Sequence, residues 1–153
     1  MKALQPLLEI ADLHANRILI AIDHIKTKIP VTATKINHLT PEELSFFELY
    51  ASRFSKLQDF MGSNLFTALL ENAGEQTETL TFIDKLNKLE KLEIIKSSDE
   101  WKKMRNIRNI LSHEYPDRPE ITAEIFNTAF SYGPMLLDCL QKMKVFLKSR
   151  DLI

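Results

Sequence analysis

Apolar residues in the first thirty positions recur at alternating steps of four and three. This seam comprises Leu4, Leu8, Ala11, Ala15, Ile18, Ile22, Ile25 and Ile29. On a helix such spacing gathers the side chains along one face, as in a coiled coil. Pro30 has no backbone N–H and restricts the residue before it. The pattern therefore predicts one long amphipathic helix that ends before Pro30.

A second long helix is predicted from Thr40 onward. Thr40 is followed by Pro41 at the first helical position and by Glu43 three residues after the cap, the signature of a capping box. Gly74 is placed to end this helix, and Gly62 is expected to bend it. The expected buried face comprises Phe47, Phe54, Leu57, Met61, Leu65 and Ala68.

Two further helices are expected next. The first runs near Thr79 to Lys96, with inward positions at Phe82, Ile83, Leu86, Leu89 and Ile94 or Ile95. Ser97 and Glu100 form a second potential capping box, so another helix begins there. This fourth helix should finish at about Glu114, because Pro116 disfavours helical geometry at Tyr115.

A last helical region repeats apolar residues toward the C-terminus, and Gly133-Pro134 marks either a kink or a break within it. Its apolar positions are Ile121, Ile125, Ala129, Tyr132, Leu136, Leu140, Met143 and Leu147. Amphipathic helices joined by short polar connections predict an all-α fold, an antiparallel up-and-down four-helix bundle with one short or broken additional helix. No linker or repeat divides the chain, so residues 1–153 are expected to form a single helical domain.

Composition narrows the class of protein. Only three glycines disfavour a loop-rich or all-β fold, and the single Cys139 cannot form an internal disulfide. We find neither a signal peptide nor a membrane-spanning run and expect a cytoplasmic protein with no membrane partner. A net charge of −1 gives no overall attraction to nucleic acid, so RNA binding would require a local basic patch.

Such a patch is predicted on the fourth helix. At roughly 100° per residue, Met104, Ile107 and Leu111 form its buried stripe and Arg108 lies on the shoulder of that stripe. The outward side is basic and rich in hydrogen-bonding groups. It carries Asn106, Asn109 and His113, with Lys102 and Arg105 close by.

Arg108 and His113 are five residues apart, which separates their directions by roughly 140° on a regular helix. Both can reach one phosphate only if the helix end loosens before Pro116, if Arg108 bends round, or if a second subunit brings its own copy. Metal-independent RNA cleavage by the 2′-OH needs two proton carriers and a cation. One motif supplies a single histidine, so the chemistry predicts a homodimer that shares one cleft.

A simpler alternative has no chemistry. An arginine and a histidine near the C-terminus of a helix interact favourably with its macrodipole whether or not they have a function. We expect no metal and no cofactor, because the sequence has no HExxH motif.

At these residues the sequence resembles the HEPN family, in particular the HepT-like toxins encoded beside a minimal nucleotidyltransferase antitoxin. Arg108, Asn109, His113 and Tyr115 match the pattern arginine, four-residue gap, histidine, any residue, tyrosine. The segments "RFSKLQDFMGSNLF" and "TFIDKLNKLEKL" are also similar to segments of such proteins. The resemblance therefore extends from Thr40 to Asp117.

The resemblance implies a metal-independent endoribonuclease toxin of a toxin–antitoxin system. Arg108 and His113 from both subunits of a homodimer would form the active site on RNA, and Asn109 would help to orient them. From the basic outward side of the fourth helix, we expect Lys102, Arg105 and Asn106 to bind RNA. Tyr115 matches the tyrosine that a cognate nucleotidyltransferase modifies with AMP, and such AMPylation would block the cleft by occupancy and charge repulsion.

Three alternatives accompany this interpretation. Tyr115 also suits an aromatic residue that simply packs at a helix end beside a proline. Some similar bundles are non-catalytic, nucleotidyltransferase-associated substrate-binding or interaction modules, called antitoxin components, in which Arg108 and His113 would recognise a phosphate without cleaving it. A purely structural helical dimer would make the motif a coincidence.

Overall fold

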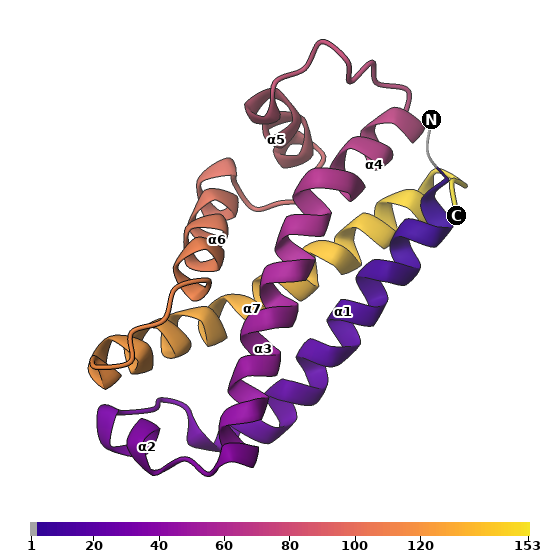
Figure 1. The fold of residues 1–153 in the computed structure, drawn as a ribbon. Helices are drawn as coiled ribbons and strands as arrows, with labels where there is room; N and C mark the ends of the chain where they lie inside the picture. Colours follow the sequence, from indigo (N-terminus) through magenta and orange to yellow (C-terminus); the bar gives the residue numbers. More distant parts are fainter. Residues whose placement is uncertain (1–2) are drawn as a thin grey trace.

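Four long helical stretches run alternately down and up the molecule in the computed structural model (Figure 1). They are α1 (Leu4–Ile25), α3 (Pro41–Phe60) with its continuation α4 (Phe66–Asn72), α6 (Ser98–Leu111) and α7 (Pro119–Ser149). The structure describes residues 3–153, so the first two residues of the expected domain lie outside it. Within that range there is no strand, and the predicted all-α bundle is confirmed.

Two short helices lie at opposite ends of the bundle (Figure 1). One is α5 (Phe82–Lys91), beside α4, and the other is α2 (Ala33–His38), which the apolar pattern did not predict. The chain before α2 is tied to α7 by Asn127, whose side-chain amide donates to Val31 O at 2.9 Å and accepts from Val31 N at 2.8 Å. This paired contact fixes α2 against the first half of α7.

The core follows the predicted seams. Of the eight positions in the predicted first seam, the five from Leu4 to Ile18 and also Ile25 are buried, whereas Ile22 and Ile29 are partly buried. All six residues of the predicted inner face of the second long helix are buried. The capping box at Thr40 is also present, with Glu43 N–H donating to Thr40 Oγ1 and Thr40 N–H donating to Glu43 Oε1.

The ends of two helices differ from the prediction. Helix α1 stops at Ile25 and a 3-10 turn, Lys26–Lys28, precedes Pro30. Helix α5 is shorter than predicted at both ends. Thr81 caps it with Asp84, and Glu93, in the left-handed region (φ 59°), closes its other end with Ile94 N–H bonded to Leu89 O.

The inward face predicted around α5 is only partly present. Ile83 is exposed, so its predicted inward position is wrong, because the real helix register turns that side outward. Ile94 and Ile95 are buried as expected, although they follow the helix rather than belonging to it.

Gly62 lies in a π-helical segment, Met61–Leu65, that widens the long helix between α3 and α4. A Cβ at Gly62 would lie 3.5 Å from the Trp101 ring and 3.6 Å from the Phe82 ring. Trp101 of α6 and Phe82 of α5 therefore pack beside this glycine at ordinary van der Waals distance. The irregularity predicted at Gly62 is present, in the form of a π-bulge.

Helix α7 continues through Gly133-Pro134 without a break. Pro134 cannot donate to the carbonyl of Phe130, four residues earlier. The buried hydroxyl of Tyr50 lies 3.4 Å from that carbonyl and donates to Ala129 O at 2.7 Å. A Cβ at Gly133 would lie 2.3 Å from Tyr50 Oη, so only glycine allows this approach.

Candidate functional site

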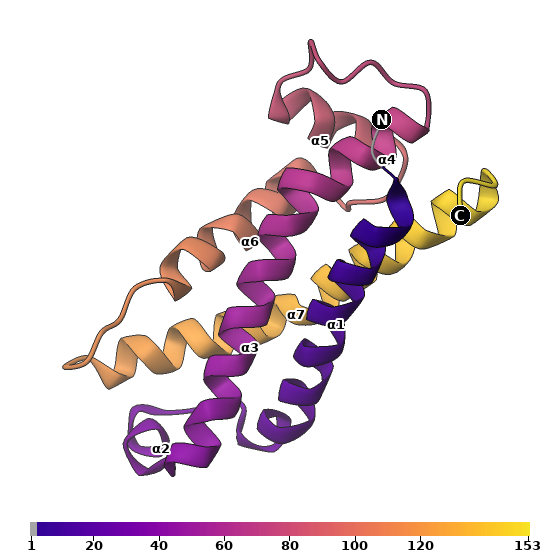
Figure 2. The same cartoon turned by 45° about the vertical axis from the view of Figure 1, so that its right-hand side comes forward.

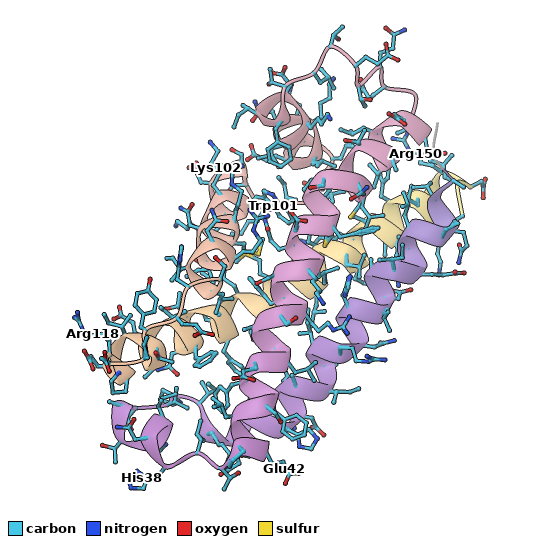
Figure 3. The ribbon with its side chains drawn as sticks, viewed as in Figure 1. His38, Glu42, Trp101, Lys102, Arg118 and Arg150 are labelled. Atoms are coloured by element: carbon cyan, nitrogen blue, oxygen red, sulfur yellow. The ribbon has the colours of Figure 1, made fainter. Side chains whose placement is uncertain are left out.

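Helix α6 begins in the core and ends at the surface. Ser97 Oγ accepts from Glu100 N–H at 3.0 Å, which is one half of the predicted capping box. Trp101 and Met104 are buried, and Ile107 and Leu111 are partly buried. Figure 3 shows Trp101 directed from α6 toward the long helix formed by α3 and α4. The buried first half thus fixes α6 in the core, and the last turn of α6 borders a pocket.

The helix ends at Leu111, earlier than the predicted Glu114. Ser112 is the C-cap, and His113 N–H donates to Ile110 O at 3.0 Å in a tightened last turn. Beyond it the chain turns again, with Arg118 N–H bonded to Tyr115 O at 3.0 Å. Of the three arrangements that would bring Arg108 and His113 together, the loosened helix end before Pro116 is therefore present.

A pocket of about 870 Å³ opens at this end of α6. Both ribbon views bring together α2, the start of α7 and the segment between α6 and α7 here (Figures 1 and 2). Four of the predicted site residues, Arg108, Asn109, His113 and Tyr115, line the pocket. The other lining residues are Ile36, Asn37, Leu44, Glu48, Ala51, Ser52, Ser55, Lys56, Asp59, Leu111, Ser112, Glu114, Pro116, Pro119, Thr122, Ile125 and Phe126.

Arg108 is held at the pocket wall by the last turn of α3. Its Nη1 donates to Gln58 Oε1 at 2.9 Å and to Asp59 Oδ1 at 3.1 Å. Gln58 is 1% exposed, whereas the Asp59 side chain is 65% exposed. A hydrogen bond from a charged donor contributes about 1.5–3 kcal/mol, and an exposed ion pair rarely more than about 1 kcal/mol. Gln58 therefore fixes the guanidinium, and Asp59 can exchange for another anion.

Asn109 is in contact with the same guanidinium. Its Oδ1 accepts from Arg108 Nη2 at 3.0 Å and from Nε at 3.3 Å. The helical wheel separates the two residues, but the long arginine side chain bridges the angle between them. Arg108 thus has acceptors on both sides, and four of its five N–H donors are hydrogen-bonded.

His113 and Tyr115 lie on the segment that follows α6. The His113 side chain is exposed and Tyr115 is partly buried. Both line the pocket together with Pro116 and Pro119, which restrict the backbone of the segment. An imidazole, a guanidinium and a phenol are therefore available to one ligand.

The charge of the pocket is mixed. Lys56 and Arg108 are opposed by Glu48, Asp59 and Glu114. A large part of the wall is apolar and is supplied by Ile36, Leu44, Leu111, Ile125 and Phe126. The pocket thus offers one fixed cation at its edge and a broad apolar surface beside it.

Three residues predicted to bind RNA do not line this pocket. Asn106 is exposed without lining it, and the guanidinium of Arg105 lies 5.8 Å from the centre of the Phe82 ring. Figure 3 shows Lys102 near the start of α6, directed away from α3. Lys102, Arg105 and Asn106 therefore belong to a different face of α6 from Arg108.

Gln58 and Asp59 were not predicted as site residues. A signal for Gln58 was present, since this amide lies four residues after buried Phe54 and next to buried Leu57. A buried polar side chain requires a partner. The sequence could not say that the partner lies fifty residues further along the chain.

Comparison with known proteins identifies no relative of this chain: no family model, no curated protein and no solved structure matches it. Among residues 3–153, no helix combines the length and the hydropathy needed to cross a membrane. Function must therefore be inferred from the side chains of the pocket.

Proposed function

We propose that the protein is a metal-independent endoribonuclease, the toxin of a HEPN-type toxin–antitoxin pair. The observation that carries the proposal is the convergence of Arg108, Asn109, His113 and Tyr115 on one pocket. The fixed orientation of the Arg108 guanidinium supports it further. A planar guanidinium suits a phosphate because its N–H groups match the phosphate oxygens, and Arg108 has one uncommitted Nη2–H and a second donor that now binds exposed Asp59.

In the proposed reaction the 2′-OH of the RNA attacks the adjacent phosphorus. Its proton passes to a base, the bond from phosphorus to the 5′-oxygen breaks, and that oxygen takes a proton from an acid. The products are a 2′,3′-cyclic phosphate and a 5′-hydroxyl. Arg108 stabilises the charge on the phosphoryl oxygens, once Asp59 has released it to the substrate.

The proton transfers require two groups, and one chain brings one His113 to the pocket. We therefore propose a homodimer in which His113 of each protomer faces a shared cleft. The exposure of His113 in the single chain supports this, since its side chain is accessible to a second protomer. One imidazole acts as base and the other as acid.

Tyr115 is the proposed site of AMPylation by a minimal nucleotidyltransferase antitoxin. Its place on the pocket wall supports this role, because an AMP group attached there brings a phosphate beside Arg108 and a base into the cavity. Intact-mass analysis after coexpression with the antitoxin should show added AMP units on the wild type and none on Tyr115→Phe. An unmodified wild type would exclude this form of regulation.

The deciding experiment is RNA cleavage by the purified protein, with detection of the cyclic phosphate. His113→Ala should reduce cleavage by roughly 10²–10⁴-fold, the usual contribution of a proton-transfer group, while the circular dichroism stays unchanged. His38→Ala is the matched control, since His38 is exposed on α2 outside the pocket. A well-folded wild type that leaves RNA intact would refute the nuclease.

The second candidate is a non-catalytic module that binds a nucleotidyltransferase. The observation that favours it is the pocket wall, where acidic side chains already oppose the cations and apolar residues dominate the α7 side. If this is the function, the protein should form a stable complex with the transferase and cleave no RNA. Phe126→Asp should then abolish the complex, whereas His113→Ala should leave it intact.

A further inference from the structure

A cationic cluster lies on the side of α3 that faces α1. Arg53 Nη1 is 3.1 Å from His14 Nδ1. Since arginine can only donate, His14 Nδ1 accepts, and the neutral ring carries its proton on Nε2. Burial lowers the pKa of His14, and the positive charges of Arg53 and Lys56 lower it further. Two cationic side chains, Arg53 and Lys56, thus lie near one neutral imidazole, His14, which can donate from Nε2.

Glu48, Asp59 and Glu114 line the pocket with Lys56, but within residues 3–153 none of them forms an ion pair with it. The ion pairs among the described residues involve neither Arg53 nor Lys56. Arg17, one helical turn beyond His14 on α1, also has no carboxylate partner there. Asp59, three residues after Lys56, forms its ion pair with Arg108 instead. The cluster therefore offers its charge to an external anion.

The cluster continues into the pocket through Lys56. This side chain acts on His14 and also lines the pocket with Arg108 and His113. Because Lys56 belongs to both, the cluster and the pocket lie on adjoining faces of α3. A helix with its side chains is only about 10 Å across. One flexible polyanion can span both faces within a few phosphates. Lys102 and Arg105 lack this continuity, because they lie on another face of α6.

We propose that His14, Arg53 and Lys56 bind the phosphate backbone of a single-stranded RNA whose scissile phosphate lies in the pocket. The inference rests on the proposed function for its choice of ligand. Two cations and the Nε2–H of His14 donate to successive phosphates without reading the bases. The strand crosses α3, and Lys56 links the part held by α1 to the part held by Arg108.

The experiment measures binding of a fluorescent single-stranded RNA of about twelve nucleotides, a few times the span of the cluster. All variants are made in the His113→Ala background, so that the RNA stays intact. For single strands each lost phosphate contact should reduce the slope of log K against log salt by about 0.7, and weaken binding about fivefold at 0.1 M salt. Arg53→Gln and Lys56→Gln should each show this change in slope and this loss of affinity. The double variant should show twice the change in slope and the product of the two losses in affinity.

Lys91→Gln, at the exposed end of α5, is the matched charge control and should leave affinity and slope unchanged. Within residues 3–153 Lys56 forms no hydrogen bond or ion pair, so its variant tests the inference even if Arg53→Gln unfolds. An unchanged slope in Lys56→Gln would overturn the proposal. A larger loss of RNA affinity in the double variant Lys102→Gln, Arg105→Gln would also overturn it. If polyglutamate competes as well as RNA does, the cluster binds an acidic protein partner and the proposal is overturned too.

Cleavage by the wild-type protein separates this inference from the proposed function. If RNA is cleaved and the Arg53 and Lys56 variants bind like their parent, the nuclease stands and the cluster is excluded. If RNA is never cleaved and binding still depends on Arg53 and Lys56, the cluster is confirmed and the nuclease is excluded. Absence of RNA binding would overturn both.

Discussion

Tyr50 and Gln58 both leave α3 as buried polar side chains, yet the two contacts they make differ in kind. Tyr50 reaches neutral backbone carbonyls inside α7, where no ligand can enter. Gln58 reaches a charged guanidinium whose side chain is 23% exposed and whose neighbour Asp59 faces solvent. The first contact stabilises a helix, and the second holds a cation ready for an anion. Buried polar groups on one helix thus serve stability and recognition separately.

The largest effect should come from Gly133→Ala. The added Cβ would meet Tyr50 Oη at 2.3 Å and the Tyr50 Cζ at 3.2 Å, which α7 cannot accept without moving. We expect a loss of about 2–3 kcal/mol in the free energy of unfolding, measured by urea denaturation. In Tyr50→Phe the hydroxyl is gone, so the double variant should lose less than the sum of the two single losses. Strict additivity would show that the two residues are uncoupled.

Loss of the contact between Gln58 and Arg108 should reduce stability less than Gly133→Ala does, but it should reduce RNA cleavage more. Gln58→Leu leaves Arg108 without its buried acceptor and should cost about 1–3 kcal/mol. Its effect on RNA cleavage should appear as a lower kcat, because a mobile guanidinium stabilises the transition state poorly. Asp59→Asn is the control and should change stability by less than about 1 kcal/mol. Equal effects of the two variants on kcat would contradict the special role of Gln58.

The smallest effect concerns pH. The pKa of His14 is below 6.5 in the folded protein, so the unfolded chain binds this proton more readily. The contribution of His14 is therefore complete above pH 6.5 and declines as the pH falls toward its folded pKa. The carboxyls of Asp84 and Glu120, whose pKa values are lowered by hydrogen bonds, act only below about pH 4.5. Between pH 7 and 5, His14→Gln should flatten the dependence of the melting temperature, and an unchanged slope would exclude His14 as its source.

Local patterns predicted the fold well, since they depend on neighbours in the sequence. The seam from Leu4 to Ile25 and the capping box at Thr40 are both present as predicted. The capping box at Thr81 and Asp84 starts α5 later than the predicted Thr79, and in this helix Ile83 is exposed. Helix ends depend on a few backbone hydrogen bonds, so they are the least predictable part of such a pattern.

The candidate site was predictable only where it is local. Arg108, Asn109, His113 and Tyr115 follow one another closely enough for the sequence to suggest a common site. Their partner Gln58 comes from another helix, and tertiary packing alone decides that contact. The separation of Lys102 and Arg105 from the pocket likewise depends on how α6 is rotated in the bundle.

The two hydrogen bonds between Asn127 and Val31 imply which wall of the pocket can move. They join the chain segment before α2 to α7 by a pair of hydrogen bonds, as neighbouring β-strands are joined, so these two walls of the pocket are tied together. The segment from Ser112 to Arg118 has no comparable tie to the rest of the bundle among its hydrogen bonds. Admission of a ligand therefore falls to the stretch that carries His113 and Tyr115, and the same displacement that widens the entrance also repositions the imidazole.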